Sequence, residues 1–201
     1  LPSGEEKLKI LQMSIEKLTN QGYVFIGMDH FAKPDDELAI AQRKGELHRN
    51  FQGYTTQPDS DLLSFGMTGI SMLQDVYTQN QKRIKDYYRD LDNNQFPLAK
   101  GVQLNGEDQL RRSIIIELMC QFHLSPQRWR EKYNIKLDAN FSDYFASEYA
   151  ELKALAKDGL VEIQGEEIEV TPAGRLLIRN IASVFDTYVK KRQKKAFSQS
   201  I

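Results

Sequence analysis

The stretch Leu47–Ile70, LHRNFQGYTTQPDSDLLSFGMTGI, decides how the fold of the whole chain is interpreted. Its polar and aromatic run at 48–56 contains Phe51 and Tyr54 among threonines, and these residue types favour a β-strand. A turn containing Pro and Asp follows this run, so we predict that a second strand begins near Leu62. The sequence therefore predicts two neighbouring strands that are joined by a polar turn.

Two glycines in the second strand, Gly66 and Gly69, leave bare backbone against which a flat ligand can lie. Aromatic and amide side chains on the first strand, facing that backbone, suit a nucleoside. A Gly-x-x-Gly spacing is nevertheless a weak signal. The alternative is a buried hairpin whose glycines occupy a β-bulge.

The composition is that of a globular protein with no strong charge preference. The chain has 201 residues, a formal net charge of -1, 40% hydrophobic residues and 27% charged residues. This size allows one large domain or two small ones, and the near-zero charge gives no general argument for nucleic acid or membrane binding. No apolar run approaches the roughly 18 residues that a membrane-spanning helix needs, and no secretory signal is visible. We therefore expect a cytoplasmic protein.

Cysteine is present once, at Cys120, so neither an internal disulfide nor a cysteine-only metal site can form within this chain. The three histidines are scattered, and none has the spacing of a zinc site on one helix. The chain opens at Leu1 in what looks like the lead-in to a helix. We therefore expect a fragment of a longer protein, with no metal ligands of its own.

The first half of the chain has the order of an α/β sheet. Ser3 can cap a helix that ends at Gly22, and the apolar run at 23–28 then predicts a buried strand. A helix that leads into a buried strand is typical of α/β sheets. His30 follows the end of this strand, where ligands bind in parallel α/β sheets. A second short helix is predicted to end at Gly45.

The remaining elements are predicted from periodicity and from turn residues. We place the boundary between two structural units near Asn105, which resembles a helix cap together with Asp108. The predicted elements before this boundary are a strand continuing through 71–78, a helix at 81–91 capped by Asn80, and a strand at 101–104. The predicted elements after it are helices at 107–122, from Ser125-Pro126, at 141–155 and from Thr171-Pro172, and a β-hairpin at 160–163 and 167–170.

The second half, helix, helix, small hairpin, helix, resembles a winged helix. A helix that reads DNA should expose Arg, Lys, Asn or Gln, whereas the helix before the hairpin has mixed charge. The hairpin carries four glutamates, which repel phosphates: Glu162, Glu166, Glu167 and Glu169. We therefore expect no nucleic-acid partner, and the same layout also serves as a packing module. The basic run at 190–195 is interpreted as a solvated helix end.

Positive charge gathers beside the first predicted strand, at Arg43, Lys44, His48 and Arg49. This charge suits an anionic substrate, and a solvated rim is the alternative interpretation. His30 and His48 lie near the proposed ligand strands, whereas His123 follows an apolar helix and is expected to be structural.

Three segments resemble one known family. Gly27–Ala32 (GMDHFA), Leu47–Thr56 (LHRNFQGYTT) and Arg175–Asn180 (RLLIRN) are similar to the oxygen-independent coproporphyrinogen III oxidases, which are radical S-adenosylmethionine enzymes. The resemblance covers essentially the whole chain, as the C-terminal portion of such an enzyme. Related heme chaperones carry a His-Asn-x-x-Tyr-Trp signature where this chain has Asn50-Phe-Gln-Gly-Tyr-Thr, and this difference favours the oxidases.

The resemblance implies a fold, an activity and cofactors. The fold is α+β, with the last strands of a partial, TIM-like α/β barrel at 1–104 and a mostly helical, winged-helix-like domain at 105–201. The family converts coproporphyrinogen III to protoporphyrinogen IX by oxidative decarboxylation of two propionates, with S-adenosylmethionine and a [4Fe-4S] cluster. The family's three-cysteine cluster motif is absent here, so this fragment alone should be inactive. An electron donor or acceptor is also implied, and we expect a monomer.

Only a few site residues transfer from the family. By resemblance, Phe51, Gln52 and Ile70 fall on positions that contact a second S-adenosylmethionine. Because the substrate carries four propionates, Arg43, Arg49 and their neighbour His48 become candidate substrate contacts. Two alternatives remain open: a heme-chaperone relative without oxidase activity, and a non-catalytic winged-helix binding module.

Overall fold

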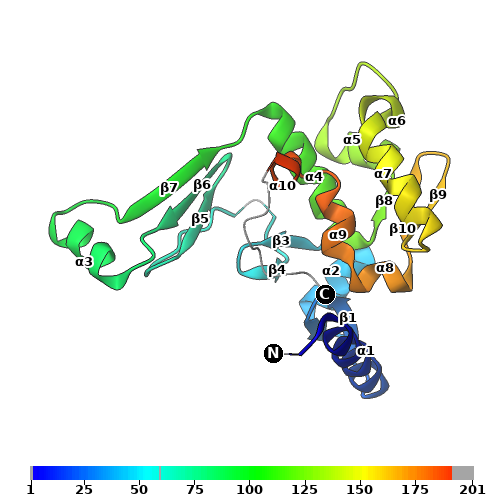
Figure 1. The fold of residues 1–201 in the computed structure, drawn as a ribbon, viewed down its shortest axis with the longest axis horizontal. Helices are drawn as coiled ribbons and strands as arrows, with labels where there is room; N and C mark the ends of the chain where they lie inside the picture. Colours follow the sequence, from blue (N-terminus) through cyan, green and yellow to red (C-terminus); the bar gives the residue numbers. More distant parts are fainter. Residues whose placement is uncertain (1, 59, 192–201) are drawn as a thin grey trace. The chain divides into compact units, whose positions relative to one another are not determined.

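The computed structural model of the protein describes residues 2–58 and 60–191 (Figure 1). Two compact units divide the chain: residues 1–56 together with 111–201, and residues 57–110. The structure is of the mixed α/β class, as predicted, and every strand pairing among the described residues is antiparallel. Most of the basic run at 190–195 lies outside the described residues.

The first unit begins with elements whose ends follow local capping chemistry. Its elements before the excursion to the second unit are α1 (Gly4–Asn20), β1 (Val24–Gly27), β2 (His30–Ala32), α2 (Glu37–Lys44), β3 (His48–Asn50) and β4 (Gly53–Thr55). The predicted Ser3 cap is confirmed as a capping box, in which Ser3 Oγ accepts from the Glu6 N–H and the Glu6 carboxylate accepts from the Ser3 N–H. Helix α2 ends as predicted at Gly45, with φ 73°.

The predicted buried strand at 23–28 is shorter than expected and turns back on itself. Strand β1 pairs with β2 in an antiparallel hairpin rather than in a parallel α/β layer. Met28, with φ 54°, lies between the two strands, so the chain reverses at the residues that follow Gly27. His30 is therefore the first residue of the returning strand and does not follow the end of a parallel strand.

The opening run at 48–56 is also a hairpin, and the prediction of one continuous strand there is wrong. Strands β3 and β4 pair with Asn50 opposite Gly53, which leaves Phe51 and Gln52 in the turn. The backbone N–H of Gln52 donates to Asn50 Oδ1 at 2.8 Å, as in an Asx turn. The short polar side chain of Asn50 and the positive φ of Gly53 thus reverse the chain despite its strand-favouring composition.

The rest of the first unit is mostly helical and contains one three-stranded sheet. Its elements are α4 (Gly106–Gln121), β8 (His123–Leu124), α5 (Pro126–Tyr133), α6 (Phe141–Tyr144), α7 (Ala146–Lys157), β9 (Val161–Gln164), β10 (Glu167–Val170), α8 (Pro172–Leu176), α9 (Ile178–Ser183) and α10 (Thr187–Lys191). Helix α4 starts in the second unit, and its predicted cap is confirmed by reciprocal bonds between Asn105 and Asp108. The predicted hairpin forms β9 and β10, and β8 extends it in the order β8-β10-β9.

Large aromatic side chains fill the helical part of this unit. Trp129 and Phe141 are packed edge to face, with their ring centroids 5.8 Å apart. Phe145 and Phe185 join them at centroid distances of 4.9–6.2 Å from Phe141 and 5.6 Å from each other. All four side chains are almost completely buried. They form the core against which α4, α5, α6 and α7 pack.

Two predicted long helices are each broken at one residue. Phe145 adopts φ -104° and ψ 40° between α6 and α7, and Leu177 adopts φ -114° and ψ 25° between α8 and α9. The amphipathic pattern continues through both positions, so periodicity could not reveal the breaks. At Phe145 the change of direction accompanies complete burial of the ring in the aromatic core.

Gly174 in α8 provides a prediction about packing. A Cβ added there would lie 2.0 Å from the carbonyl oxygen of Leu160, whereas a Cβ added at Gly106 would meet no atom within 4 Å. Gly174→Ala should therefore force backbone apart and lower the free energy of unfolding by about 1–3 kcal/mol. Gly106→Ala, the matched control, should be close to neutral in the same urea titration. Equal stability of the two variants would contradict the packing explanation.

The second unit, residues 57–110, is built around a three-stranded antiparallel sheet and one helix. Its elements are β5 (Ile70–Leu73), β6 (Val76–Asn80), α3 (Ile84–Asp92) and β7 (Leu98–Gln103), with strand order β5-β6-β7. The predicted strand at 71–78 turns at Gln74, whose φ is 50°. Asn80 ends β6 instead of capping a helix, because its side-chain amide donates to the carbonyl oxygens of Ser64 and Gly66.

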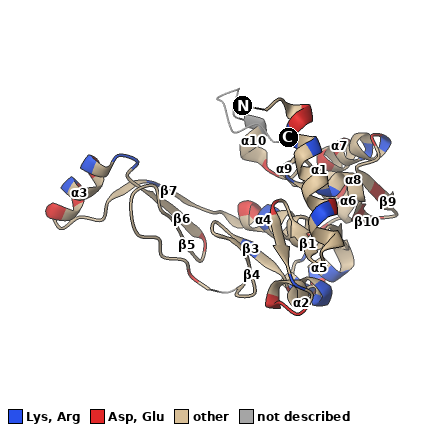
Figure 2. Ribbon diagram, turned by 90° about the horizontal axis from the view of Figure 1, so that it is seen from below, with Lys and Arg blue, Asp and Glu red and all other residues tan. Residues whose placement is uncertain are grey.

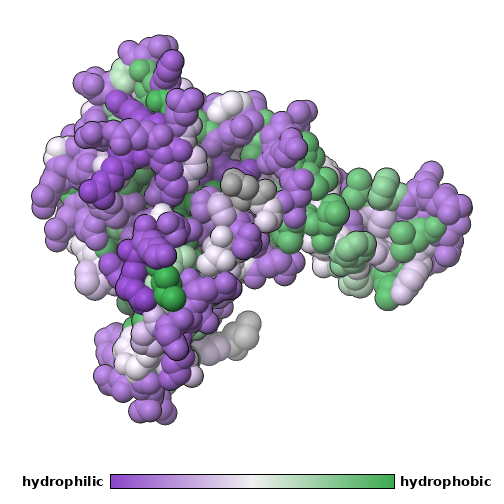
Figure 3. Space-filling view, turned by 180° about the vertical axis from the view of Figure 1, so that it is seen from behind, coloured by the Kyte–Doolittle hydropathy of each residue, from purple (hydrophilic) through white to green (hydrophobic). Residues whose placement is uncertain are grey.

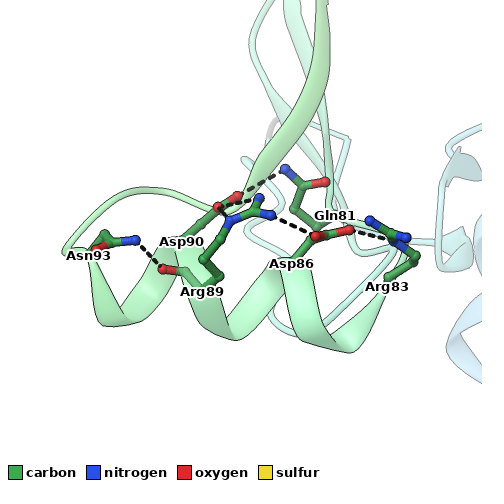
Figure 4. A network of polar contacts seen from close by, with 6 residues as sticks. All are labelled: Gln81, Arg83, Asp86, Arg89, Asp90 and Asn93. Carbon is green, nitrogen blue, oxygen red and sulfur yellow. Dashed lines mark hydrogen bonds and ion pairs between the residues drawn. The ribbon is translucent and has the colours of Figure 1, made fainter.

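Helix α3 carries a network of ion pairs in which the aspartates are shielded and the arginines are largely exposed. Asp86 lies 2.6 Å from Arg83 and 2.7 Å from Arg89, and Arg89 also contacts Asp90 at 2.8 Å (Figure 4). Both aspartate side chains are only 13% exposed. Gln81, which follows β6, donates to Asp90 at 2.9 Å. Figure 2 shows both signs of charge on this helix.

The outer side of α3 is apolar. Ile84 and Tyr88 are 58% and 56% exposed, and Leu91, one turn further on, is also exposed. Their spacing of four and three residues puts them on one face of the helix. Large apolar side chains elsewhere in this unit are exposed as well, at Leu63, Phe65, Met67, Phe96, Leu98 and Val102. Figure 3 shows the resulting apolar surface over the elements of this unit.

Candidate functional site

The turn between β3 and β4 presents two of the predicted ligand contacts. Phe51 is 54% exposed, and Gln52 beside it is also exposed. The Asx turn fixes the backbone at Gln52. An exposed aromatic face beside an amide is the combination that can stack on a base and hydrogen-bond to its edge.

Ile70, the third predicted cofactor contact, lies in the second unit as the first residue of β5. It is half-buried, and its carbonyl oxygen accepts from Ser64 Oγ at 2.5 Å. A Cβ at Gly69 would lie 3.0–3.2 Å from Ser64 Cβ and from the carbonyl oxygens of Phe65 and Gly66. The bare face of Gly69 is thus filled by its own loop, whereas a Cβ at Gly66 would meet nothing within 4 Å.

A buried tyrosine of β4 attaches the β3–β4 hairpin to α4. Tyr54 donates its hydroxyl to the carbonyl oxygen of Met119 at 3.1 Å, and burial raises the pKa of this phenol far above its ordinary value. The ring of His30 packs edge to face on Tyr54 at a centroid distance of 5.1 Å. A Cβ at Gly53 would lie 2.9 Å from His30 Nε2, so the imidazole sits directly over the backbone of β4. His30 therefore braces the hairpin.

The positively charged candidates lie at different places in the first unit. Arg49, on β3, rests over the ring of Tyr54 with its guanidinium carbon 4.7 Å from the ring centroid. His48 precedes it on the same strand, opposite Thr55, and is half-buried. Arg43 is exposed in the last turn of α2, so it does not belong to the hairpin. Only Arg49 and His48 are thus carried by the strand that leads to Phe51.

Arg43 instead lines a separate cavity of about 430 Å³. The cavity lies between the end of α2 and the elements α4, β8 and α5. Its ionisable lining side chains are Arg43, Lys44, Glu117, His123, Arg128 and Lys132. His123 is held there by Glu167, 3.1 Å away, which agrees with its predicted structural role.

The described residues do not fit an iron–sulfur cluster. Cluster irons are held by several cysteine thiolates, and Cys120 is the one cysteine of the sequence. Its side chain is completely buried, and burial raises the pKa of its thiol to about 12. Nor do three or more His, Cys, Asp or Glu side chains gather in a metal-binding group within residues 2–58 and 60–191. Among the described helices, none is long and apolar enough to span a bilayer.

Sequence reasoning missed one residue beside this site. Arg175, on α8, places its guanidinium carbon 4.7 Å from the ring centroid of Phe122. Phe122 stacks with Phe25 of β1 at a centroid distance of 6.5 Å, so this arginine lies near the β1–β2 hairpin. The sequence contained a signal, since Arg175 opens the third family-like segment.

Comparison with known proteins gives consistent matches. The family model described as the HemN C-terminal domain matches residues 104–177. The oxygen-independent coproporphyrinogen III oxidase of Synechocystis sp. is 62% identical over 202 residues, which cover 100% of this chain and 43% of that protein. The enzymes of the same name from Thermostichus vulcanus and Escherichia coli are 54% and 52% identical, over 100% and 96% of this chain and 61% and 41% of their own lengths.

A solved structure agrees with these sequence matches. It is coproporphyrinogen III oxidase (HemN) from Escherichia coli, described as a radical SAM enzyme. The similarity has a TM-score of 0.84 and 53% sequence identity, over 94% of this chain and 42% of that chain. The chain thus spans between two-fifths and about three-fifths of the length of these relatives. Over its whole length the chain is similar to the C-terminal portion of the oxygen-independent coproporphyrinogen III oxidases, and residues 104–177 match the family model of the HemN C-terminal domain.

Proposed function

We propose that this chain is the C-terminal part of a radical S-adenosylmethionine oxidoreductase of porphyrin and heme biosynthesis. Its reaction is the oxidative decarboxylation of coproporphyrinogen III to protoporphyrinogen IX. The observation that carries this proposal is the high identity to relatives of that name over the entire chain. The part of the relatives that this chain does not match is where the cluster-binding cysteines are proposed to lie.

The chain alone is proposed to be inactive. In the complete enzyme a [4Fe-4S] cluster, when bound, supplies the electron that cleaves S-adenosylmethionine. The single cysteine is buried, and its thiol holds its proton at neutral pH, so no residue of this chain is assigned to the cluster. We assign no catalytic residue to this chain and derive no reaction step through the cluster.

The residues of this chain are assigned to binding and to water exclusion. Phe51 is proposed to stack on the adenine of a second S-adenosylmethionine, and Gln52 to hydrogen-bond to it, because both side chains are exposed at the end of a fixed turn. Ile70 is proposed to contact the same molecule. Arg49 and His48 on β3 are proposed to bind substrate propionates, with Arg43 as a more distant contact.

The proposed fold assigns residues 1–104 to the end of a partial, TIM-like barrel and residues 105–201 to a winged-helix-like domain. The sheet β8-β10-β9 beside α4, α5 and α7 supports the second assignment. This domain is proposed to cover the active site and keep water from a reactive radical. The acidic hairpin argues against nucleic acid as its partner.

We further propose a cytoplasmic monomer that has no membrane attachment. Its partners are proposed to be coproporphyrinogen III and an electron donor or acceptor. Gel filtration with light scattering of the full-length protein would test the monomer, and a mass of twice that of one full-length polypeptide would contradict it.

The cofactor assignment predicts a loss of activity in the full-length enzyme when the turn is changed. Phe51→Ala should remove a stacking contact worth about 1–3 kcal/mol, which lowers anaerobic turnover of coproporphyrinogen at limiting S-adenosylmethionine by roughly 5- to 100-fold. Gln52→Ala should act in the same direction with a smaller effect. Gln127→Ala, on the exposed surface of α5, is the control. Unchanged turnover in both turn variants would contradict the site assignment. A separate outcome concerns the function: hemin binding by the wild type without any turnover of coproporphyrinogen would favour a heme-chaperone function.

A further inference from the structure

Two arginines of the first unit rest on aromatic rings in the same way. The guanidinium carbon of Arg49 lies 4.7 Å from the ring centroid of Tyr54, and that of Arg175 lies 4.7 Å from the ring centroid of Phe122. Both arginines are half-buried. Aromatic faces hold a guanidinium in place by cation–π attraction and leave its edge, where the N–H groups point, for a planar anion.

The two rings that carry these arginines meet at one glycine. A Cβ added at Gly27 would lie 2.2 Å from the hydroxyl oxygen of Tyr54 and 3.1 Å from Cζ of Phe122. The Tyr54 hydroxyl and the Cζ edge of Phe122 therefore lie close together, next to the backbone of Gly27. Arg49, Tyr54, Phe122 and Arg175 thus form a continuous row beside Gly27 of β1, and we call these four residues the arginine row.

Neither guanidinium of the arginine row is neutralised. Arg49 Nη1 and Arg175 Nε are buried and make no hydrogen bond, and neither arginine has an ion pair with a carboxylate among the described residues. Removing part of a guanidinium from water without a partner is unfavourable. Arg111, elsewhere in this unit, is by contrast paired with a carboxylate, since it lies 2.8 Å from Glu148.

We propose that the arginine row is a carboxylate-binding site and that it takes propionates of the substrate. This inference rests on the proposed function, because coproporphyrinogen supplies several carboxylates on one ring system. Each guanidinium would bind one carboxylate through parallel N–H···O bonds. Arg49 lies on β3, two residues before Phe51 in the turn, so the row adjoins the hairpin that is assigned to the second S-adenosylmethionine. Arg175 thereby becomes a substrate-positioning residue from the helical part of the chain.

Carboxylates that bind these arginines are also carried by acidic side chains, which the part of the relatives that this chain does not match can supply. The experiment therefore separates a free ligand from a protein carboxylate. Binding of coproporphyrin III, the fluorescent oxidised form of the substrate, is titrated against the full-length protein. Its neutral tetramethyl ester is titrated in parallel. The variants are Arg49→Gln, Arg175→Gln and Arg175→Lys, and the control is Arg179→Gln on the exposed surface of α9.

We expect each glutamine variant to weaken coproporphyrin binding by roughly 10- to 100-fold, as the loss of one charge-assisted contact implies. Arg175→Lys should recover part of the loss, the ester should show no difference between wild type and variants, and Arg179→Gln should bind normally. Normal binding in both glutamine variants would overturn the propionate assignment. So would a lowered melting temperature with normal binding, since the carboxylate would then belong to the protein. If the glutamine variants bind coproporphyrin more weakly than the wild type, and the wild type shows no turnover, the binding site is retained and the proposed activity is refuted.

Discussion

Arg111→Ala should lower the free energy of unfolding of this chain by about 3–5 kcal/mol, because it leaves a buried carboxylate without its cation. Arg111 Nη1 lies 2.8 Å from Glu148 Oε1, and the two side chains are only 14% and 7% exposed. The same nitrogen donates to the carbonyl oxygen of Phe185 at 3.3 Å, and the guanidinium lies over the ring of Phe145. The arginine therefore connects α4 and α7 to the aromatic core.

Urea titration followed by circular dichroism measures this loss. The control is Lys9→Ala, which removes an exposed pair with Glu5 at 2.7 Å within one helix. Because exposed pairs contribute little, the control should be indistinguishable from wild type. A loss below about 1 kcal/mol in Arg111→Ala would show that the carboxylate finds another partner or reaches water.

The same pair predicts a dependence of stability on acid. Burial acts to raise the pKa of Glu148, but hydrogen bonds from Ser147 and Arg111 outweigh it and hold the pKa below its ordinary value. A carboxyl whose pKa is lowered by folding stabilises the native state above its unfolded pKa, and this contribution is lost as the pH falls through the lowered folded pKa. Wild-type stability should therefore fall below about pH 4.5, near the ordinary pKa of a glutamate. The fall should be smaller in Arg111→Ala.

Trp129→Ala should cost about 3–5 kcal/mol of stability. The indole is 1% exposed, packs edge to face on Phe141, and donates from Nε1 to Ser113 Oγ at 2.8 Å. Alanine removes the largest side chain of the core and also the donor to Ser113. Trp129→Phe keeps most of the apolar volume, so its cost should be clearly smaller.

Thermal unfolding of the two variants tests this ranking. Phe96→Ala is the control, because Phe96 is an exposed aromatic residue of the second unit, and its removal should leave the transition unchanged. Equal losses in Trp129→Ala and Trp129→Phe would mean that the hydrogen bond to Ser113, and not the packing, determines the stability. That result would contradict the cavity argument.

Local chemistry made several elements predictable. The caps at Ser3 and Asn105 depend on residues three positions away and form as predicted, and the helix predicted to open at Ser125-Pro126 begins there with Ser125 as its cap. The β9–β10 hairpin was also predictable, because alternating residues flank Gly165, whose φ is 63°.

Elements that depend on distant partners were not predictable in this way. The run at 48–56 contains strand-favouring aromatic residues and threonines, and only Asn50 and Gly53 show that it turns at Phe51. The parallel arrangement predicted for the strand at 23–28 failed because a helix followed by an apolar run does not specify the direction of the next strand. The break at Phe145 depends on an aromatic core to which residues far apart in the sequence contribute, Trp129, Phe141 and Phe185.

The site was predictable only along β3. Positive charge beside an aromatic run pointed to Arg49, which the structure places on the ring of Tyr54. Arg43 was grouped with it because the two are close in sequence, yet Arg43 belongs to the end of α2 and lines another cavity. Arg175 is brought to the site by the path of the chain through α8, which no local pattern encodes. Gly69 was assigned to a ligand, but its bare face accommodates its own loop.

Helix α3 carries its ion pairs and its exposed apolar residues on different parts of its surface, so added salt acts on the second unit in two ways. Added salt screens the attraction of Arg83 and Arg89 for Asp86, which weakens contacts within the helix and at its N-terminal end. Strongly hydrated anions such as sulfate at the same time favour removal of Ile84 and Tyr88 from water, which promotes self-association. Dilute buffers of low ionic strength should therefore keep the purified chain dispersed, and salting-out conditions should precipitate it through this face first.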